Sequence, residues 1–379
     1  MTNQTDKPGY KKTEIGIIPE DWALDKISNL AKITTGSKNT QDKEETGRYP
    51  FFVRSQKVER INTYSFNGEA VLTAGDGVGT GKIFHYINGK FDYHQRVYKI
   101  SDFREDIHGY FFFLYFSNYF LKRIQLLTAK SSVDSVRGET INDMEIPLPP
   151  IQEQSAIAQV LSDTDQLIES LNKLIQKKKK IKQGAMQELL TGRKRLPGFS
   201  GRWEEKALRE LLDYEQPGKY IVKDSSYTGS NTPVLTANKT FILGYTDETD
   251  GVYIDTPVII FDDFTTEKKY VDFPFKVKSS AMKILKPKNN NVHLKYMADR
   301  LHLLEFQTTD FKQRCYISQY QNLIVTIPPI QEQTAIAQVL SDMDSEIEEL
   351  ERKRDKYQEI KKGMMQKLLT GEIRLPIKT

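Results

Sequence analysis

Apolar residues recur at alternating steps of four and three positions in two long stretches, residues 149–197 and 328–376. This spacing is typical of helices that pack as a coiled coil. The two seams consist of Ile157, Leu161, Ile168, Leu171, Ile175 and Leu189, and of Ile336, Leu340, Met343, Ile347, Leu350, Tyr357, Met364 and Leu368. Each stretch begins at two prolines and ends at Leu-Thr-Gly with a later proline, which are helix start and stop signals. We therefore predict two long helices, each roughly 60 Å in length.

The two stretches are copies of one sequence, matching at about 31 of 49 positions. Their opening "PPIQEQSAIAQVLSDTD" returns as "PPIQEQTAIAQVLSDMD". An apolar seam alone does not require the polar residues outside it to stay the same. Recent duplication is the alternative explanation, but the segments between the copies have diverged within the same chain. We interpret the repeated polar residues as two equal docking surfaces for two copies of one partner. The docking candidates are Gln152, Glu153, Gln154, Gln159 and Asp163, and in the second copy Gln331, Glu332, Gln333, Gln338 and Asp342.

The segments before each helix, residues 1–148 and 198–327, are rich in Tyr, Phe, Thr and Val, with turn residues every few positions. This pattern predicts short strands joined by tight turns. We also expect one helix in each segment, at about residues 105–128 and 292–309. Their openings are alike, since Trp22, Ile27, Leu30 and Gly36 correspond to Trp203, Leu208, Leu211 and Gly218 at nearly the same spacing. The two globules are therefore expected to share one fold with diverged surfaces.

Composition restricts the possible partners and cellular locations of the chain only slightly. The chain of 379 residues has a net charge of +4, which permits a nucleic-acid partner without requiring one. One cysteine, Cys315, excludes a disulfide framework and a four-cysteine zinc site, and fits a reducing cytoplasm. The N-terminus lacks the apolar segment of a signal peptide. The most apolar run, residues 110–121, is too short to cross a bilayer and is interpreted as a buried helix.

Two motifs invite an enzymatic interpretation. "AGDGVGTGK" (residues 74–82) resembles a phosphate-binding loop, but Asp76 stands where the first glycine should be and Ile83 where Ser or Thr should bind magnesium. A turn between strands, or a turn whose backbone approaches DNA phosphate, remains open. Asp262 or Asp263 with Glu267 and Lys269 has the composition of a metal-dependent nuclease site, but this combination is common by chance and a charged surface turn between two strands is the favoured interpretation. The histidines show no metal-ligand spacing, and the sequence contains no H-E-x-x-H, G-x-S-x-G or methyltransferase motif, so we expect no catalytic residue and no metal site.

The proline-prolyl start with "IQEQ", the "AIAQVLSD" helix and the "LLTG…RLP" ending, each present twice, resemble the specificity (S) subunits of type I restriction–modification enzymes. The resemblance covers nearly the whole chain. It implies an α/β (α+β) fold of two target-recognition domains, residues 1–148 and 198–327, and two conserved helical regions, residues 149–197 and 328–379. The helices are expected to pack as an antiparallel coiled coil with pseudo-two-fold symmetry.

The resemblance implies that the chain reads a bipartite, asymmetric site on double-stranded DNA and is not itself an enzyme. It implies two modification subunits that methylate adenine with S-adenosylmethionine, and restriction subunits that cut DNA with ATP and magnesium. The alternatives are a scaffold whose globules bind protein or glycan, and a self-sufficient nuclease.

Residues that read bases should be polar and placed on exposed turns. The candidates in the first globule are Arg54, Ser55, Gln56, Lys57, Arg60, Lys82, Gln95, Arg96, Lys130, Ser131, Ser132 and Arg137. Those in the second are Asn238, Lys239, Lys268, Lys269, Lys278, Ser279, Ser280, Lys312 and Arg314.

Overall fold

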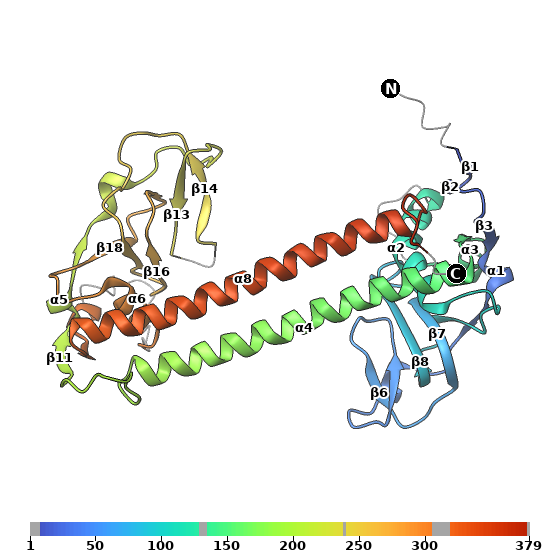
Figure 1. Ribbon diagram of the computed structural model, residues 1–379, viewed down its shortest axis with the longest axis horizontal. Coiled ribbons are helices and arrows are strands. Elements are labelled where there is room, and N and C mark those ends of the chain that lie inside the picture. Colours follow the sequence, from blue (N-terminus) through green and yellow to red (C-terminus); the bar gives the residue numbers. More distant parts are fainter. Residues whose placement is uncertain (1–7, 129–134, 238–239, 305–318, 377–379) are drawn as a thin grey trace. The chain divides into compact units, whose positions relative to one another are not determined.

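The computed structural model describes residues 8–128, 135–237, 240–304 and 319–376 (Figure 1). The chain divides into two compact units. The first unit contains residues 1–171 and 353–379, and the second contains residues 172–352. Each unit therefore combines one globule with half of each long helix.

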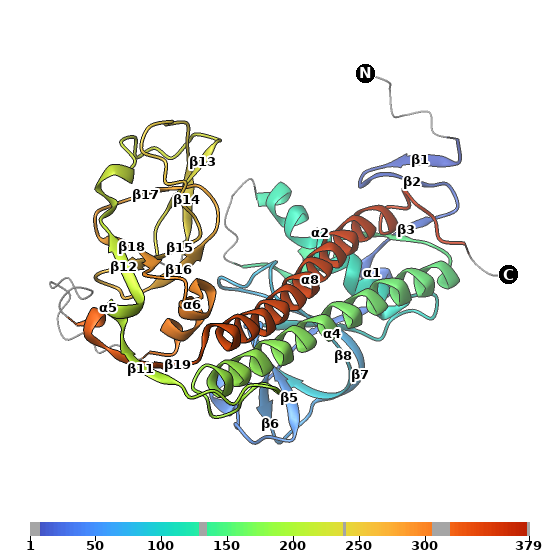
Figure 2. The ribbon, with the colours of Figure 1, turned by 60° about the vertical axis from the view of Figure 1, so that its left-hand side comes forward.

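The two long helices are α4 (Ile151–Leu189) and α8 (Ile330–Leu368), both 39 residues long. Each begins directly after its two prolines, as the sequence predicts. Within each unit a half of α4 lies beside a half of α8 (Figures 1 and 2). In the second unit Lys182 of α4 is paired with Asp344 near the start of α8, and in the first unit Lys361 is paired with Asp165 at 2.6 Å. The helix halves are therefore antiparallel in both units, and the same lysine–aspartate contact occurs in each copy of the repeat.

The globule of the first unit is built on a six-stranded sheet in the order β4-β9-β7-β8-β5-β6. The bounds of its strands are β4 Lys32–Thr35, β5 Tyr49–Phe52, β6 Glu59–Ile61, β7 Phe66–Ala74, β8 Phe84–Tyr93 and β9 Val97–Ser101. Two antiparallel pairs stand beside the sheet, β1 (Tyr10–Thr13) with β2 (Gly16–Pro19), and β3 (Ala23–Lys26) with β10 (Glu145–Leu148). The shorter helices are α1 (Ile27–Leu30) and α3 (Gly138–Asn142), and a 3-10 turn covers Thr40–Asp42.

Helix α2 (Gly109–Thr128) carries the aromatic run and supplies the core of the first unit. Phe111, Phe112, Phe116 and Phe120 are fully buried, each typically worth about 1.5–3 kcal/mol of burial free energy. They belong to one apolar cluster that also contains residues of β7, α4 and α8. The globule and the helix pair thus share a core. The predicted buried helix is confirmed, although it starts later than residue 105.

The globule of the second unit has a four-stranded sheet in the order β12-β18-β15-β16 and a three-stranded sheet in the order β14-β13-β17. The bounds are β12 Leu212–Glu215, β13 Thr232–Leu235, β14 Ile242–Thr246, β15 Val258–Asp262, β16 Lys268–Val271, β17 Lys276–Val277 and β18 Met282–Pro287. Strand β11 (Glu204–Ala207) pairs with β19 (Ile324–Ile327). The helices are α5 (Leu208–Leu211) and α6 (Leu294–His302), with 3-10 turns at Pro217–Tyr220 and Tyr320–Asn322. Helix α6 ends at His302, and residues 305–309 of the predicted helix lie outside the described residues.

The two globules repeat the same frame around different sheets. In both, a strand after a tryptophan leads into a one-turn helix, α1 or α5, and pairs with the strand that precedes the long helix. Ile27 and Leu30 of α1 and Leu208 and Leu211 of α5 are buried, so residues at equivalent positions in the sequence have the same place in both globules. Helices α2 and α6 begin in the same way, because the ring Nδ1 of His108 or His293 accepts a bond from a main-chain N–H three residues later at 3.3 Å. The frame is conserved within the chain and the sheets are not.

Candidate nucleic-acid interface

The repeated glutamates at the start of the long helices are buried. Glu153 is 0% exposed and accepts two bonds from the guanidinium of Arg374, each 2.6 Å long. The Trp22 indole nitrogen donates to the same carboxylate at 3.2 Å. In the second unit Arg195 donates to the Glu332 carboxylate from Nε and from Nη2, each at 2.5 Å. The Trp203 indole nitrogen donates to the same carboxylate at 3.2 Å. Each glutamate thus holds the segment after one long helix against the start of the other.

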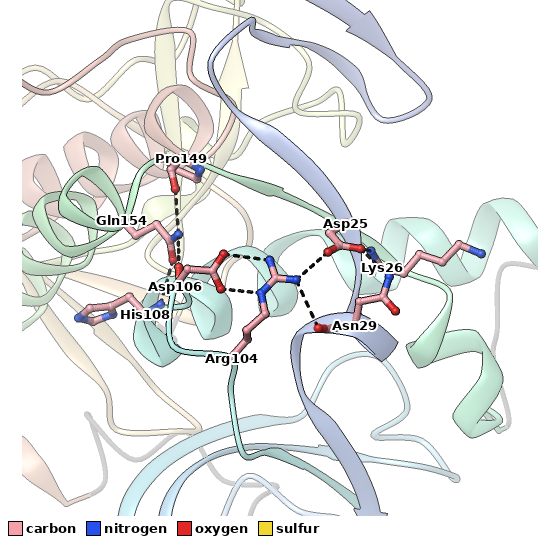
Figure 3. Close-up of polar contacts among 8 residues, drawn as sticks. All are labelled: Asp25, Lys26, Asn29, Arg104, Asp106, His108, Pro149 and Gln154. Carbon is pink, nitrogen blue, oxygen red and sulfur yellow. Dashed lines mark hydrogen bonds and ion pairs between the residues drawn. The ribbon is translucent and has the colours of Figure 1, made fainter.

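The repeated glutamines are also buried, and each makes three hydrogen bonds, which Figure 3 shows for Gln154. The Gln154 side chain donates to the carbonyl oxygens of Asp106 and Pro149, both at 2.9 Å, and accepts from the His108 N–H at 2.9 Å. Gln333 repeats these bonds with the carbonyls of Asn291 and Pro328, at 3.0 and 2.8 Å, and with the His293 N–H at 2.9 Å. These amides join the start of each long helix to the loop that precedes α2 or α6.

The structure therefore corrects part of the docking prediction. Glu153, Gln154, Glu332 and Gln333 have almost no surface to offer a partner, since each is at most 1% exposed. Their repetition comes from bonds inside the chain. The sequence held a signal for this, because the tryptophan and the arginine of "RLP" recur together with the glutamate.

The other docking candidates remain exposed and lie on one face of their helices. Gln152, Gln159 and Asp163 form the α4 stripe, and Gln331, Gln338 and Asp342 form the α8 stripe. Residues seven and four positions apart share a helix face. The Gln159 amide donates to Asp163 at 2.7 Å, and Gln338 donates to Asp342 at 2.7 Å. The two stripes thus present the same polar groups in the same internal arrangement.

The first globule gathers several base-reading candidates on loops of its sheet. Arg54, Ser55, Gln56 and Lys57 lie between β5 and β6, Lys82 lies before β8, and Gln95 and Arg96 lie between β8 and β9. Arg54 and Arg96 meet on the Asp76 carboxylate, each at 2.5 Å.

The remaining candidates of the first globule are more dispersed. The Arg60 guanidinium bonds to the carbonyls of Gly47 and Arg48, at 2.9 and 2.6 Å. The Gln95 amide donates to Asn39 at 2.6 Å, and Arg137 is exposed before α3. Lys130, Ser131 and Ser132 lie outside the described residues.

Five of the base-reading candidates of the second globule are among the described residues. Lys278 and Ser279, after β17, line a pocket of about 610 Å³ together with residues of the β15–β16 turn. Ser280 is exposed nearby, and Lys269 is half-buried in β16. Lys268 is 8% exposed, and burial lowers its pKa, so the structure removes it from the residues that can reach a base. Asn238, Lys239, Lys312 and Arg314 lie outside the described residues.

The family model described as "Type I restriction modification DNA specificity domain" matches this chain twice, over residues 19–183 and 201–362. Each match covers one globule and most of the long helix that follows it. The chain belongs to the type I restriction–modification DNA specificity family. It is a specificity subunit, and such subunits act with DNA and with the other subunits of a restriction–modification complex.

Relatives agree with this placement. The specificity subunit is 49% identical over 149 residues to the EcoR124I/EcoR124II specificity subunit of Escherichia coli, a match covering 38% of this chain and 36% of that protein. It is 26% identical over 422 residues to the MjaVIII specificity subunit of Methanocaldococcus jannaschii, covering 94% of both chains. The crystal structure of an S subunit from M. genitalium shares the fold, with a TM-score of 0.65, 18% identity, and coverage of 94% of this chain and 97% of that one.

Family membership favours DNA recognition over the protein- or glycan-binding scaffold, and the geometry weakens the nuclease alternative. Asp262 accepts main-chain bonds from Phe264 and Thr265, both at 2.9 Å, and so shapes its own turn. Asp263 forms an ion pair of 2.9 Å with Lys283, both side chains being 0% exposed. These two carboxylates act within the fold of the specificity subunit.

Among the described residues there is no group of three or more His, Cys, Asp and Glu side chains placed to hold a metal ion. Within the same residues, no helix has the length and apolar character needed to cross a membrane.

Proposed function

We propose that this specificity subunit reads a bipartite, asymmetric DNA site, with one half-site for each globule. The observation that carries the proposal is the contrast between the two copies. The frame of Trp, Glu, Gln and Arg is repeated bond for bond, whereas the sheets and their polar loops differ in strand order and sequence. Two different reading surfaces on one repeated frame suit two different half-sites.

We further propose that two modification subunits dock on the α4 and α8 stripes, one on each. The stripes offer the same side chains with the same internal bond, as identical partners require. At the start of α8, Gln331 also borders a pocket of about 400 Å³ lined by Arg202, Lys206, Asn291 and the two prolines. The modification subunits would methylate adenine with S-adenosylmethionine. Restriction subunits that join through them would use ATP and magnesium, and the complex would work in the cytoplasm.

Exchanging residues 198–327 for the second globule of another specificity subunit tests the two-reader model. We expect one half of the recognised site to change and the other half to stay. Affinity for the original site should fall at least roughly a thousandfold, towards non-specific binding. Sequencing of methylated adenines in the host genome measures both halves at once. A change in both half-sites, or in neither, contradicts the model.

Charge reversal in the stripes tests the docking proposal. Asp163→Lys should weaken the binding of one modification subunit at least about tenfold, and Asp342→Lys should do the same for the other. The double variant should bind none, whereas both single variants should yield complexes with one modification subunit by native mass spectrometry. Gln183→Lys, at another exposed position of α4, adds the same kind of charge and is the matched control. Normal binding of two subunits by the double variant contradicts the assignment.

A further inference from the structure

The glycine-rich motif at residues 74–82 forms a self-closed turn between β7 and β8. The Thr80 N–H and hydroxyl both donate to the Gly77 carbonyl, at 3.0 and 2.8 Å, and the Ile83 N–H donates to Gly79 at 3.0 Å. Gly77 has a φ of +79°, which favours glycine. At Gly79 a Cβ atom would lie 2.3 Å from the Ile83 side chain. The turn therefore has a defined shape, and it fixes the residue at its start, Asp76.

Asp76 holds two arginines that come from other loops. Its Oδ1 accepts from Arg54 Nη1 and its Oδ2 accepts from Arg96 Nη1, both at 2.5 Å. Burial alone would raise the pKa of the carboxyl, but the bonds from Arg96 and Arg54 outweigh it and lower the pKa, so Asp76 is ionised at neutral pH. The Gly75 N–H donates to the Arg96 carbonyl at 2.9 Å, which ties the turn to the second arginine loop. One carboxylate thus aligns two guanidinium groups side by side.

Both arginines keep solvent-exposed donor nitrogens beside their bond to Asp76. Their side chains are 40% and 60% exposed, whereas Asp76 is 21% exposed. Each guanidinium uses only Nη1 on Asp76, and among the described residues no bond is found to Nε or Nη2 of either arginine. Partly exposed ion pairs of this kind add little to stability. Neighbouring guanidinium nitrogens are, however, the donors that form two parallel bonds to the O6 and N7 acceptors of guanine in the major groove.

Charge favours a base over a phosphate as the acceptor. The carboxylate neutralises one of the two guanidinium charges, which weakens the attraction for an anion and places a negative group behind the site. The acceptors of guanine are uncharged, so the Asp76 carboxylate weakens their hydrogen bonds to the arginines only slightly. We infer that Arg54 and Arg96 each read a guanine in the half-site of the first globule, with Asp76 as the residue that positions both. This inference rests on the proposed function and adds to it the base class and the residues.

Binding of the complete complex to a series of duplexes tests the inference. Each duplex carries one base-pair change in the half-site of the first globule, which the globule exchange identifies. Arg54→Ala and Arg96→Ala should each reduce discrimination at one G·C pair roughly tenfold to a hundredfold, and leave the other half-site unchanged. Arg96→Lys keeps the positive charge but loses the two parallel N–H donors of the guanidinium, so it should have the same effect as Arg96→Ala. Arg48→Ala removes an exposed arginine of the same globule that does not contact Asp76, and should leave discrimination intact.

The positioning role of Asp76 has its own signature. Asp76→Asn should relax discrimination at both G·C pairs together, and Asp76→Glu, which keeps a carboxylate, should restore part of it. Phosphate binding would instead give a uniform loss of affinity for all duplexes. The slope of log affinity against log salt concentration would then fall by about one for each arginine removed, and this result would overturn the inference. Unchanged discrimination in all variants also overturns it. If the unaltered complex recognises no bipartite site, the proposed function fails as well. If it does, and the arginine variants alone behave normally, only this inference fails.

Discussion

Removing the Glu332 carboxylate should lower the free energy of unfolding of the second unit by about 3 kcal/mol. Glu332 is 1% exposed and is bonded to Arg195 and Trp203. In Glu332→Ala the indole N–H loses its acceptor and the Arg195 guanidinium keeps only the Gly201 carbonyl, while the space around them stays closed to most water. We place the effect at the lower end of the cost of breaking a buried pair, because the Arg195 side chain is 29% exposed and recovers part of its hydration.

The two tryptophans provide the measurement, since each unit contains one of them. In a Trp22→Phe background, fluorescence during chemical denaturation reports on the second unit alone, and the Glu332→Ala transition should move to lower denaturant. Glu153→Ala in a Trp203→Phe background should do the same for the first unit. Glu188→Ala, at an exposed position of α4, is the control and should change stability by less than about 0.5 kcal/mol. Equal stability of Glu332→Ala and this control would show that the buried bonds are not structural.

The chain should also assemble from two separate polypeptides, residues 1–197 and residues 198–379. The first piece contains Glu153, Asp165, Lys182 and Arg195, and the second contains their counterparts. Both glutamate–arginine pairs and both lysine–aspartate pairs therefore have one partner in each piece. Mixed in equal amounts, the pieces should elute as a one-to-one complex with the mass of the intact chain. Two monomers at tens of micromolar would contradict this expectation.

The same contacts predict a competing product, a homodimer of residues 1–197, because this piece carries both sides of the repeated bonds. The middle of the helices disfavours it. Lys178 and Lys179 pair with Glu346 and Glu351 at 2.6 and 2.7 Å, and the first copy has Leu167 and Asn172 at those two positions. Exposed pairs contribute at most about 1 kcal/mol each, so the mixed complex should be favoured by up to roughly thirtyfold.

Charge exchange provides the control for this assembly. Lys182→Asp in the first piece should weaken the mixed complex, because it sets an acid against Asp344. Asp344→Lys in the second piece should restore it. Sedimentation velocity of the four combinations separates this effect from misfolding. A complex that is insensitive to both changes would show that the apolar seam alone holds the pieces together.

The sequence was most informative where periodicity or a backbone rule applies. The paired prolines and the four-three spacing located both long helices, and the insertion of a globule between them suggested the antiparallel packing that the Lys182–Asp344 pair shows. Strand order within the globules could not be inferred, because short strands of similar composition pair equally well in many orders. The sequence predicts the end of α2 correctly, but the helix starts at Gly109 and not near residue 105, because residues before His108 form turns.

The site was harder to predict than the fold. A repeated polar residue can be kept by a partner or by a bond within the chain, and periodicity does not separate the two. The sequence therefore predicts a docking role for Glu153 and Gln154, whereas the structure buries them. Arg54 and Arg96 stood among the base-reading candidates, but their meeting on Asp76 depends on how three loops fold together. A test that asks which charged and aromatic residues recur together would have linked Glu153, Trp22 and Arg374.

The division of the chain between the units has a consequence for its synthesis on the ribosome. The second unit is one continuous stretch, whereas the first needs residues 353–379 to complete a globule that begins at the N-terminus. The globule that emerges first is therefore finished last. At about 5–20 residues per second, the ribosome takes roughly ten to thirty-five seconds to pass from Arg195 to Arg374. During this interval Glu153 lacks its own arginine, and the equivalent arginine that it can meet is Arg195 of a neighbouring nascent chain, because the 39-residue helix α4 separates Glu153 from Arg195 of the same chain. Accurate assembly then depends on the second unit capturing Arg195 with Glu332 before that exchange occurs.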